Sequence, residues 1–396
     1  MTLNRSCKKI STLHLLVLLS FLILLTNVTS ADDETDPVLD FVDPTPEDGA
    51  SQALGIVNIN VTIVEENLTS LTYNWDETNY TMYEDSLVLM YNFDNVAILG
   101  EDSTTVIDMS SNTNTGSFSV SPDADSGYSI SGKYNGAWMF DGGGDYIEVG
   151  DVLDFSGNAP FTVSAWFKKE SSVPNGDYWA IVNKFTDIKV GENRGNTGWL
   201  IGVRQGNKFF FDRWESGTES VSILDETLNN DVWYHVVGTY NGTHIKTYLN
   251  GQFGDSSESS FSLSDKEDSL RIGGRSDGWS NAYFDGTIDE VRIWNRCLTD
   301  EEIYIHYASN LNKINQTHWN YNITQKKNTT DELDIGTYTY QVFSEDINSN
   351  TAQTEQRTIE ITGPAPPIPE TSTIILLAMG VIITIGLVLN KRRDAI

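Results

Sequence analysis

The chain has 396 residues, of which 39% are apolar and 11% aromatic, so it can bury a core and wholesale disorder is excluded. Between residues 31 and 370 there are 19 basic and 55 acidic side chains. Such a surface repels phosphate backbones and anionic lipid head groups and attracts cations, which excludes nucleic acid as a partner. Cys7 and Cys297 are the only cysteines, too few for a disulfide framework or a thiolate zinc site.

Residues 1–31 have the pattern of a secretory signal peptide. Three basic residues, Arg5, Lys8 and Lys9, precede an apolar stretch at residues 13–25, and small residues follow at 29–31. We expect cleavage there, with an uncleaved anchor as the alternative. Residues 32–48 then hold eight acidic residues, three prolines and no basic residue. This composition predicts that residues 32–54 form a disordered linker.

From residue 56 onward, β-branched and aromatic residues alternate with polar ones in short runs separated by Gly, Asn, Asp and Ser. This period of two predicts an all-β protein built as an antiparallel sandwich. The pairs Asn241-Gly242 and Asn250-Gly251 bracket one run and suit tight type I′ hairpins. One helix is expected after residue 299, because Thr299 and Glu302 have the spacing of a capping box.

Residues 85–312 carry a series of motifs in a fixed order. They are LVLMYNFD at 87–94, MFDGGGDYIEV at 139–149, FTVSAWF at 161–167, WYHVVGTY at 233–240, YLNG at 248–251, FDGTIDEVRIWN at 284–295 and LTDEEI at 298–303. Together they resemble the laminin-G-like, concanavalin A-like lectin/glucanase family. The resemblance implies a jelly-roll sandwich that recognises glycans or glycoproteins.

The same resemblance implies a structural Ca²⁺ at Asp289, which matches the last-strand aspartate that holds this ion in many members. Hard cations prefer several oxygen ligands, and Asp141 and Asp145 are further candidates. A second cation site is conceivable at the loop from Asp277 with Asp285. For Asp141, Asp145 and Asp285 the alternative is ordinary turn chemistry, because Asp before Gly is common in turns.

Glycan binding requires exposed aromatic side chains. Trp279 and Tyr283 lie in a polar loop and, with Asn281, are the predicted ligand-binding residues; simple loop packing is the alternative for Trp279. In the run from Phe209 to Trp214 the alternation is less clean, and one face is expected to be core.

The segments on either side of the jelly roll, 55–84 and 313–363, continue the strand pattern. Neither alone has enough strands to bury a sandwich core. We therefore predict that they combine into one discontinuous immunoglobulin-like domain, with a hairpin loop at 346–350; two unrelated hairpins are the alternative. Sequons for N-glycosylation lie at Asn60, Asn67, Asn79, Asn241, Asn315, Asn322 and Asn328.

The C-terminal region predicts a membrane anchor. A proline-rich spacer at 364–371 precedes an apolar stretch at 372–390, and basic residues follow in the tail 391–396. These features predict a transmembrane helix with a cytoplasmic tail and the bulk of the chain outside the cell. The tail also resembles the PEP-CTERM type of prokaryotic, including archaeal, sorting signal, although Thr371 departs from that pattern.

Recognisable catalytic motifs are few. Residues 274–278 match GxSxG, but no helix is expected after them, as a nucleophile elbow requires. Jelly-roll glycanases use acids spaced along one strand, and residues 86–311 contain no such run. The sequence thus predicts a non-catalytic, membrane-anchored recognition or adhesion protein at the cell surface, assisted by Ca²⁺. An architectural envelope protein and an unrecognised carbohydrate-active enzyme are the alternatives.

Overall fold

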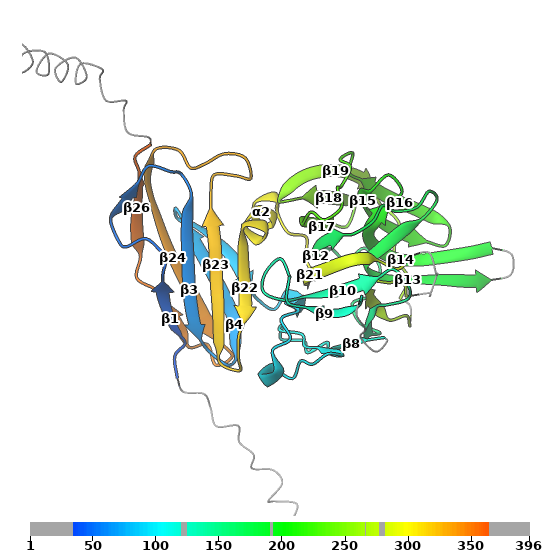
Figure 1. Cartoon of the computed structure of the whole chain (residues 1–396), viewed down its shortest axis with the longest axis horizontal. Helices are drawn as coiled ribbons and strands as arrows, with labels where there is room; N and C mark the ends of the chain where they lie inside the picture. The colour runs from blue at the N-terminus through cyan, green and yellow to red at the C-terminus, as the bar shows by residue number, and fades with distance from the viewer. Residues whose placement is uncertain (1–34, 120–124, 191–192, 266, 277–281, 364–396) are drawn as a thin grey trace, which may run out of the picture.

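The computed structural model describes residues 35–119, 125–190, 193–265, 267–276 and 282–363. Within these ranges the protein is all-β with a single α-helix, which confirms the predicted fold class at this level. Two lobes lie side by side (Figure 1). One lobe, the flanking unit, contains strands from both ends of the described chain, and the other, the inserted unit, contains the strands between them.

The flanking unit consists of two sheets. The first has the order β1 (Val38–Val42), β3 (Val57–Val64), β23 (His318–Gln325), β22 (Ser309–Lys313). The second has the order β2 (Ala50–Gln52), β26 (Arg357–Ile361), β24 (Gly336–Asp346), β4 (Leu68–Trp75), β5 (Thr78–Tyr83), with β25 (Thr351–Gln353) paired to β24.

Period-two alternation explains why these distant segments combine. In β3 the residues Val57, Ile59, Val61 and Ile63 are fully buried while the residues between them are not. Strand β3 pairs antiparallel with β23, and β4 pairs antiparallel with β24, so segments about 250 residues apart complete one core. Neither segment could bury its apolar face alone.

The acidic segment at 32–54 is not the disordered linker that its composition predicts. Its described part contains β1 and β2; Leu39 is buried, and the Phe41 ring meets Tyr340 edge to face at 5.5 Å. Strand β1 pairs with β3, and β2 pairs in parallel with β26. An acidic residue can be part of such a strand because alternate side chains point to opposite faces, and Asp40 faces the solvent.

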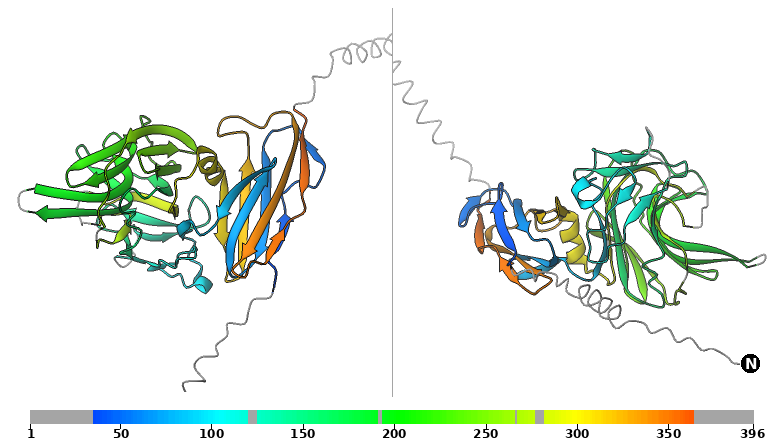
Figure 2. Two further views of the ribbon diagram at one scale, coloured as in Figure 1. Left: turned by 180° about the vertical axis from the view of Figure 1, so that it is seen from behind. Right: turned by 90° about the horizontal axis from the view of Figure 1, so that it is seen from below.

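The inserted unit is a sandwich of two eight-stranded sheets (Figure 2). One sheet, called here the covered sheet, has the order β19 (Gln252–Glu258), β18 (His244–Leu249), β17 (Tyr234–Tyr240), β12 (Phe161–Lys169), β21 (Asp285–Trp294), β10 (Ala137–Asp141), β9 (Gly127–Ser129), with β6 (Leu87–Tyr91) paired to β21. The other, called the open sheet, has the order β16 (Thr218–Ile223), β15 (Lys208–Glu215), β14 (Asn193–Arg204), β13 (Tyr178–Val190), β20 (Leu270–Ile272), β11 (Ile147–Gly150), β8 (Gly116–Phe118), β7 (Thr105–Val106).

Side chains from the two inner faces form the core of the inserted unit. Phe161 and Val163 on the covered sheet meet Trp199, Ile201 and Phe211 on the open sheet, all of them fully buried. Each such side chain contributes about 1.5–3 kcal/mol through removal of apolar surface from water.

Helix α2 (Asp300–Ala308) lies between the two lobes (Figure 1). Its capping box is present as predicted: the Thr299 hydroxyl accepts a hydrogen bond from the Glu302 amide, and Glu302 accepts one from the Thr299 amide at 2.8 Å. Strand β22 follows directly and pairs with β23. The inserted unit therefore ends at the helix, and residues 309–312, which the sequence assigns to it, belong to the flanking sheet.

Several predicted segments lie outside the described residues. They are the signal peptide, the proline-rich spacer, the apolar stretch at 372–390 and the basic tail. Among the residues that the structure describes, every helix is too short or too polar to traverse a lipid bilayer.

Candidate functional site

An unusual apolar surface covers the outer face of the open sheet, on the side away from the core. Leu200 and Phe210 are buried there although their strand neighbours Ile201 and Phe211 already fill the core face. Alternation along β14 and β15 places one set of side chains on each face. Because this second apolar set has no sheet packed over it, the arrangement is typical of a ligand-binding surface.

A pocket of about 230 Å³ opens on this surface. Its walls combine aromatic rings, two arginines and the three acidic residues Asp177, Asp212 and Glu219, and they come from β13 and the turn before it, β14, β15, β16 and the segment after β20. The residues that define it are Tyr178, Phe185, Leu200, Arg204, Phe210, Asp212, Trp214, Glu219 and Arg275.

Asp212 lies at the bottom of the polar part of the pocket and is only 8% exposed. One oxygen, Oδ2, accepts a hydrogen bond from the Trp214 indole N–H at 2.5 Å, whereas the buried Oδ1 has no partner. Burial, and then the nearby Glu219 carboxylate, raise the pKa of Asp212 well above its ordinary value. A buried carboxyl oxygen without a partner is costly, and a ligand hydroxyl would satisfy it.

The arginines of the pocket are held against aromatic rings. The Arg275 guanidinium donates a hydrogen bond to the Tyr178 hydroxyl and lies 4.6 Å from the centre of the Phe185 ring. Arg204 lies 5.9 Å from the Phe210 ring. Contacts of this kind restrict both side chains, so the donors around Asp212 are positioned before any ligand arrives.

Of the predicted ligand-binding residues, Tyr283 does not line this pocket. Trp279 and Asn281, and the predicted cation ligand Asp277, lie outside the described residues. Tyr283 stacks on Tyr146 with ring centres 6.5 Å apart, beside Gly274.

The sequence contained a signal for the actual pocket. In Lys208–Glu215 the alternate residues Phe210, Asp212 and Trp214 share one face of the strand, and Phe209 and Phe211 on the other face belong to the core. The partners Arg204, Glu219 and Arg275 come from other segments, and only the fold brings them together.

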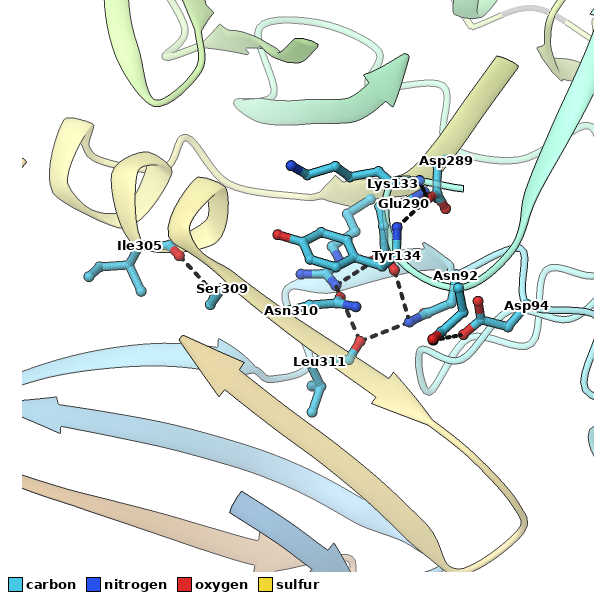
Figure 3. A network of polar contacts seen from close by, with 12 residues as sticks. Asn92, Asp94, Lys133, Tyr134, Asp289, Glu290, Ile305, Ser309, Asn310 and Leu311 are labelled. Atoms are coloured by element: carbon cyan, nitrogen blue, oxygen red, sulfur yellow. Dashed lines mark hydrogen bonds and ion pairs between the residues drawn. The ribbon is translucent and has the colours of Figure 1, made fainter. Parts of the chain in front are cut away.

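The surroundings of Asp289 do not fit a Ca²⁺ ligand. Asp289 is fully buried, and its Oδ2 accepts hydrogen bonds from the backbone amides of Lys133 at 2.8 Å and Tyr134 at 3.1 Å (Figure 3). Its Oδ1 accepts from the Glu290 amide at 2.7 Å. N–H groups directed at both oxygens satisfy the carboxyl, whereas a cation would require oxygen atoms there.

Asp141, Asp145 and Asp285 come together at another corner of the sandwich. Asp141 on β10 is paired with Asp285 on β21. Asp145 contacts Asp141, and the buried Oδ2 of Asp145 has no hydrogen-bond partner. Burial, then Asp141, raise the pKa of Asp145. The Asp285 carboxylate accepts a hydrogen bond from the Ser171 hydroxyl. Within the described ranges, no three His, Cys, Asp or Glu side chains form a group suited to a metal ion.

The asparagines of all seven sequons lie in described parts of the chain, and none is buried. Asn67, Asn79 and Asn241 are exposed, and the other four are half-buried. Their modification stays a prediction.

A second polar cluster lies at the seam between the two units. Glu290 and Arg292, on the outer face of the covered sheet, form a buried ion pair at 2.7 Å. Arg292 also donates to the Asn310 side chain at 3.0 Å and to the Leu311 carbonyl at 3.3 Å, both on β22 of the flanking unit (Figure 3). Asn92 donates to the same Leu311 carbonyl at 2.8 Å.

Two histidines line the same small cavity. His235 and His306 are 3% and 4% exposed, and neither His235 Nδ1 nor either ring nitrogen of His306 has a hydrogen-bond partner. Burial, followed by the nearby positive charges, lowers the pKa of His235 to about 3 and lowers that of His306 well below its ordinary value. Both rings are therefore neutral in the folded protein near pH 7.

Comparison with known proteins bears on the inserted unit. Residues 141–304 match the sequence model of the concanavalin A-like lectin/glucanases superfamily, which confirms the predicted resemblance.

Two curated proteins match part of the chain. The N,N-dimethylformamidase beta subunit of Paracoccus aminophilus is 27% identical over 186 residues, which cover 40% of this chain and 23% of that protein. Pappalysin-1 of Mus musculus is 28% identical over 181 residues, which cover 42% of this chain and 11% of that protein. The chain thus spans less than a quarter of either relative.

Solved structures with a related fold include domain 4 of AbnA, an extracellular arabinanase from Geobacillus stearothermophilus, in complex with arabinotriose. It has a TM-score of 0.42 and 20% identity, over 55% of this chain and 96% of that domain. Another is a domain of a Ruminococcus gnavus sialidase bound to α2,3-sialyllactose, with a TM-score of 0.32 and 13% identity, over 37% of this chain and 80% of that one.

These matches correct the prediction that the protein is not an enzyme. One of its sequence relatives is a subunit of an enzyme. The absence of a familiar motif along one strand was too narrow a criterion, because acids can meet from neighbouring strands. Asp212 on β15 and Glu219 on β16 do so in the pocket of the open sheet.

Proposed function

We propose that the protein binds a glycan in the pocket of the open sheet. The observation that carries this proposal is Asp212 Oδ1, a buried acceptor without a partner beside aromatic rings and two arginines. Sugars combine hydroxyl donors with apolar C–H faces, so one hydroxyl can donate to Asp212 while the ring packs on Trp214 or Tyr178. The superfamily of residues 141–304 supports the same ligand class.

The test is a glycan array probed with the purified full-length protein, followed by titration of the best ligand. Asp212→Ala and Trp214→Ala should each weaken binding about tenfold or more, since each removes a contact that a buried ligand cannot replace. Glu226→Gln, which changes an exposed acid outside the pocket, serves as the charge control and should bind normally. Unchanged affinity in both pocket variants would overturn the proposal.

A second function is supported at the same pocket, namely glycoside hydrolysis. In the antiparallel pairing of β15 with β16, Asp212 is opposite Val221 and Trp214 is opposite Glu219. Asp212 and Glu219 are therefore diagonal neighbours on the same face of the sheet. Diagonal neighbours have side chains roughly 7–8 Å apart, within the range that inverting glycosidases use. The buried Asp212, with its raised pKa, would be the general acid and the exposed Glu219 the base.

Hydrolysis is tested by incubating array-positive oligosaccharides with the protein and measuring reducing ends. Asp212→Asn and Glu219→Gln should each abolish release if these residues are the acid and base. Binding without any release by the unmodified protein would leave recognition as the function of the pocket.

The finer architecture and the location form part of the same proposal. The inserted unit is proposed to be a jelly roll, the flanking unit an immunoglobulin-like stalk, and the protein an anchored adhesion protein that displays the pocket outside the cell. The apolar segments near the two ends of the sequence support this location. Protease treatment of intact cells should release fragments of residues 35–363, and mass spectrometry of the surface protein shows whether the C-terminal peptide remains.

We propose calcium at the corner of Asp141, Asp145 and Asp285, where Asp145 supplies an oxygen without a partner; because the described carboxylates do not by themselves form a three-ligand group, the ion would also need backbone carbonyls and water. A cation that binds only the folded state raises the melting temperature. Chelation should therefore lower Tm, and Asp145→Asn should remove this response while Asp289→Asn keeps it. An identical Tm with and without chelator would remove calcium from the proposal.

A further inference from the structure

A second pocket, of about 220 Å³, lies at the seam between the two units, far from the outer face of the open sheet. It is bounded by helix α2, by the loop 131–136 of the inserted unit and by the end of β23. We call it the seam pocket and define it by Lys133, Tyr134, Trp166, Tyr304, Tyr307 and Lys326. Nothing in the proposed function uses it.

The loop that carries Lys133 is fixed by Asp289. The Lys133 and Tyr134 amides both donate to Asp289 Oδ2, and a Cβ at Gly132 would lie 2.0 Å from the Gly136 carbonyl oxygen. The loop therefore cannot shift without breaking buried hydrogen bonds. In this arrangement Asp289, which resembles a calcium ligand in sequence, instead positions the residues of the seam pocket.

The two lysines of the pocket have no acidic partner in the described part of the chain. Other lysines of the protein form ion pairs: Lys327 lies 2.7 Å from an Asp334 oxygen, and Lys184 lies 2.6 Å from an Asp151 oxygen. Within the described ranges, neither Lys133 nor Lys326 has a carboxylate oxygen within 4 Å of its ammonium group. The Lys133 ammonium instead lies 4.1 Å from the centre of the Trp166 ring. In a protein with a net charge of −31, two unpaired lysines in one aromatic pocket are unexpected.

The chemistry of the walls defines the ligand. Tyr304 and Tyr307, both on helix α2, are half-buried and offer apolar ring surface to the pocket. Lys133 and Lys326 line the same pocket and give its walls positive charge. An apolar surface bordered by cations suits a ring that bears a negative group.

We propose that the seam pocket binds an anionic monosaccharide unit, a hexuronate, whose carboxylate contacts Lys133 and Lys326 while its ring packs on Tyr304 and Tyr307. This site is separate from the proposed glycan pocket, because the two lie on opposite outer faces of the inserted sandwich. An acidic polysaccharide could thus engage the protein at two places.

The test uses the full-length protein, made in a host without N-glycosylation because the sequon residue Asn328 also lines the seam pocket. Calorimetric titration compares glucuronate, glucose and inorganic phosphate. Glucuronate should bind, glucose should bind at least about tenfold more weakly, and added salt should weaken the glucuronate complex. Phosphate that binds as well as glucuronate would show an anion site without sugar recognition and would overturn the proposal.

Variants separate this site from the pocket of the open sheet. Lys133→Gln and Lys326→Gln should each reduce glucuronate affinity about tenfold, with Tm unchanged as evidence of folding. Lys327→Gln, the adjacent exposed lysine that pairs with Asp334, is the matched control and should bind normally. Asp212→Ala should affect only the open-sheet pocket. Normal glucuronate binding by Lys133→Gln and Lys326→Gln would contradict the proposed site.

Discussion

The two sheets of the inserted unit have the same core face but very different outer faces. The outer face of the covered sheet carries Glu290, Arg292 and His235, which are buried beside helix α2 and the start of β22. The outer face of the open sheet carries an apolar cluster around Phe210 and a carboxyl oxygen of Asp212 without a partner. On the covered face the Glu290–Arg292 pair is completed by hydrogen bonds to β22, while Nδ1 of His235 and both ring nitrogens of His306 are enclosed without partners. On the open face the oxygen of Asp212 without a partner lines a pocket that a ligand can enter.

The largest expected effect comes from breaking the buried ion pair at the seam. Arg292→Ala leaves Glu290 buried and unpaired and removes the hydrogen bonds to Asn310 and Leu311. The free energy of unfolding should fall by about 3–5 kcal/mol in denaturant titration. Arg204→Ala on the open sheet is the matched control and should cost less than about 1 kcal/mol. Equal losses would contradict the contrast between the two faces.

Acid should also act on the covered face. The folded-state pKa of His235 is about 3, against about 6.5 in the unfolded chain, so below pH 6.5 the unfolded state binds more protons. The contribution of His235 to the free energy of unfolding is fully present above pH 6.5. It falls by about 1.4 kcal/mol per pH unit between pH 6.5 and pH 3.

The contribution of His235 is isolated by comparison with His235→Gln, because the other titrating groups are common to both proteins. The variant should lose less stability than the parent between pH 6.5 and 4.5. Replacement of the exposed His244 by Gln is the control for the substitution itself. Parallel profiles for the parent and His235→Gln would contradict this assignment.

Adjacent residues on β14 allow the two faces of the open sheet to be compared directly. Ile201→Ala creates a cavity in the sandwich core and should cost about 2–5 kcal/mol. Leu200→Ala enlarges a pocket that already opens to solvent and should cost about 1–2 kcal/mol less. Thermal unfolding of both variants checks this order, and a larger loss for Leu200→Ala would show that the outer cluster is structural core.

The smallest predicted effect concerns the helix at the seam. Thr299→Ala removes the side-chain acceptor of the Glu302 amide and should lower stability by about 1 kcal/mol. Thr218→Ala, at an exposed strand end, is the control. No loss for Thr299→Ala would mean that tertiary packing alone holds the helix.

Local chemistry was readable from the sequence. The strand pattern, the capping box at Thr299 and the loop after Asp346 are all present in the structure. Asn250 and Gly251 both have positive φ, as a type I′ turn requires. At Asn241 the prediction was wrong: only Gly242 has a positive φ, and the Asn241 side chain accepts hydrogen bonds from the Thr243 and His244 amides.

Long-range partners could not be read in this way. The acidic linker forms strands because β3 and β26 lie beside it, and no property of residues 32–54 alone specifies those neighbours. The amides that surround Asp289 come from a loop more than 150 residues away. The pocket around Asp212 likewise depends on Arg275, which reaches it only through the pairing of β13 with β20.

The insertion has a mechanical consequence. The chain enters the inserted unit near Ser86 and leaves it at Ser309. The entry segment is joined to the residues that follow β21: the Asn295 amide donates a hydrogen bond to the Ser86 carbonyl, and Arg296 forms an ion pair with Glu84 at 2.7 Å. A pull on a ligand held by this unit is therefore shared between two covalent crossings, and neither can twist alone. Such a connection resists rotation of the inserted unit and would transmit tension from a bound ligand to the flanking unit at a fixed angle.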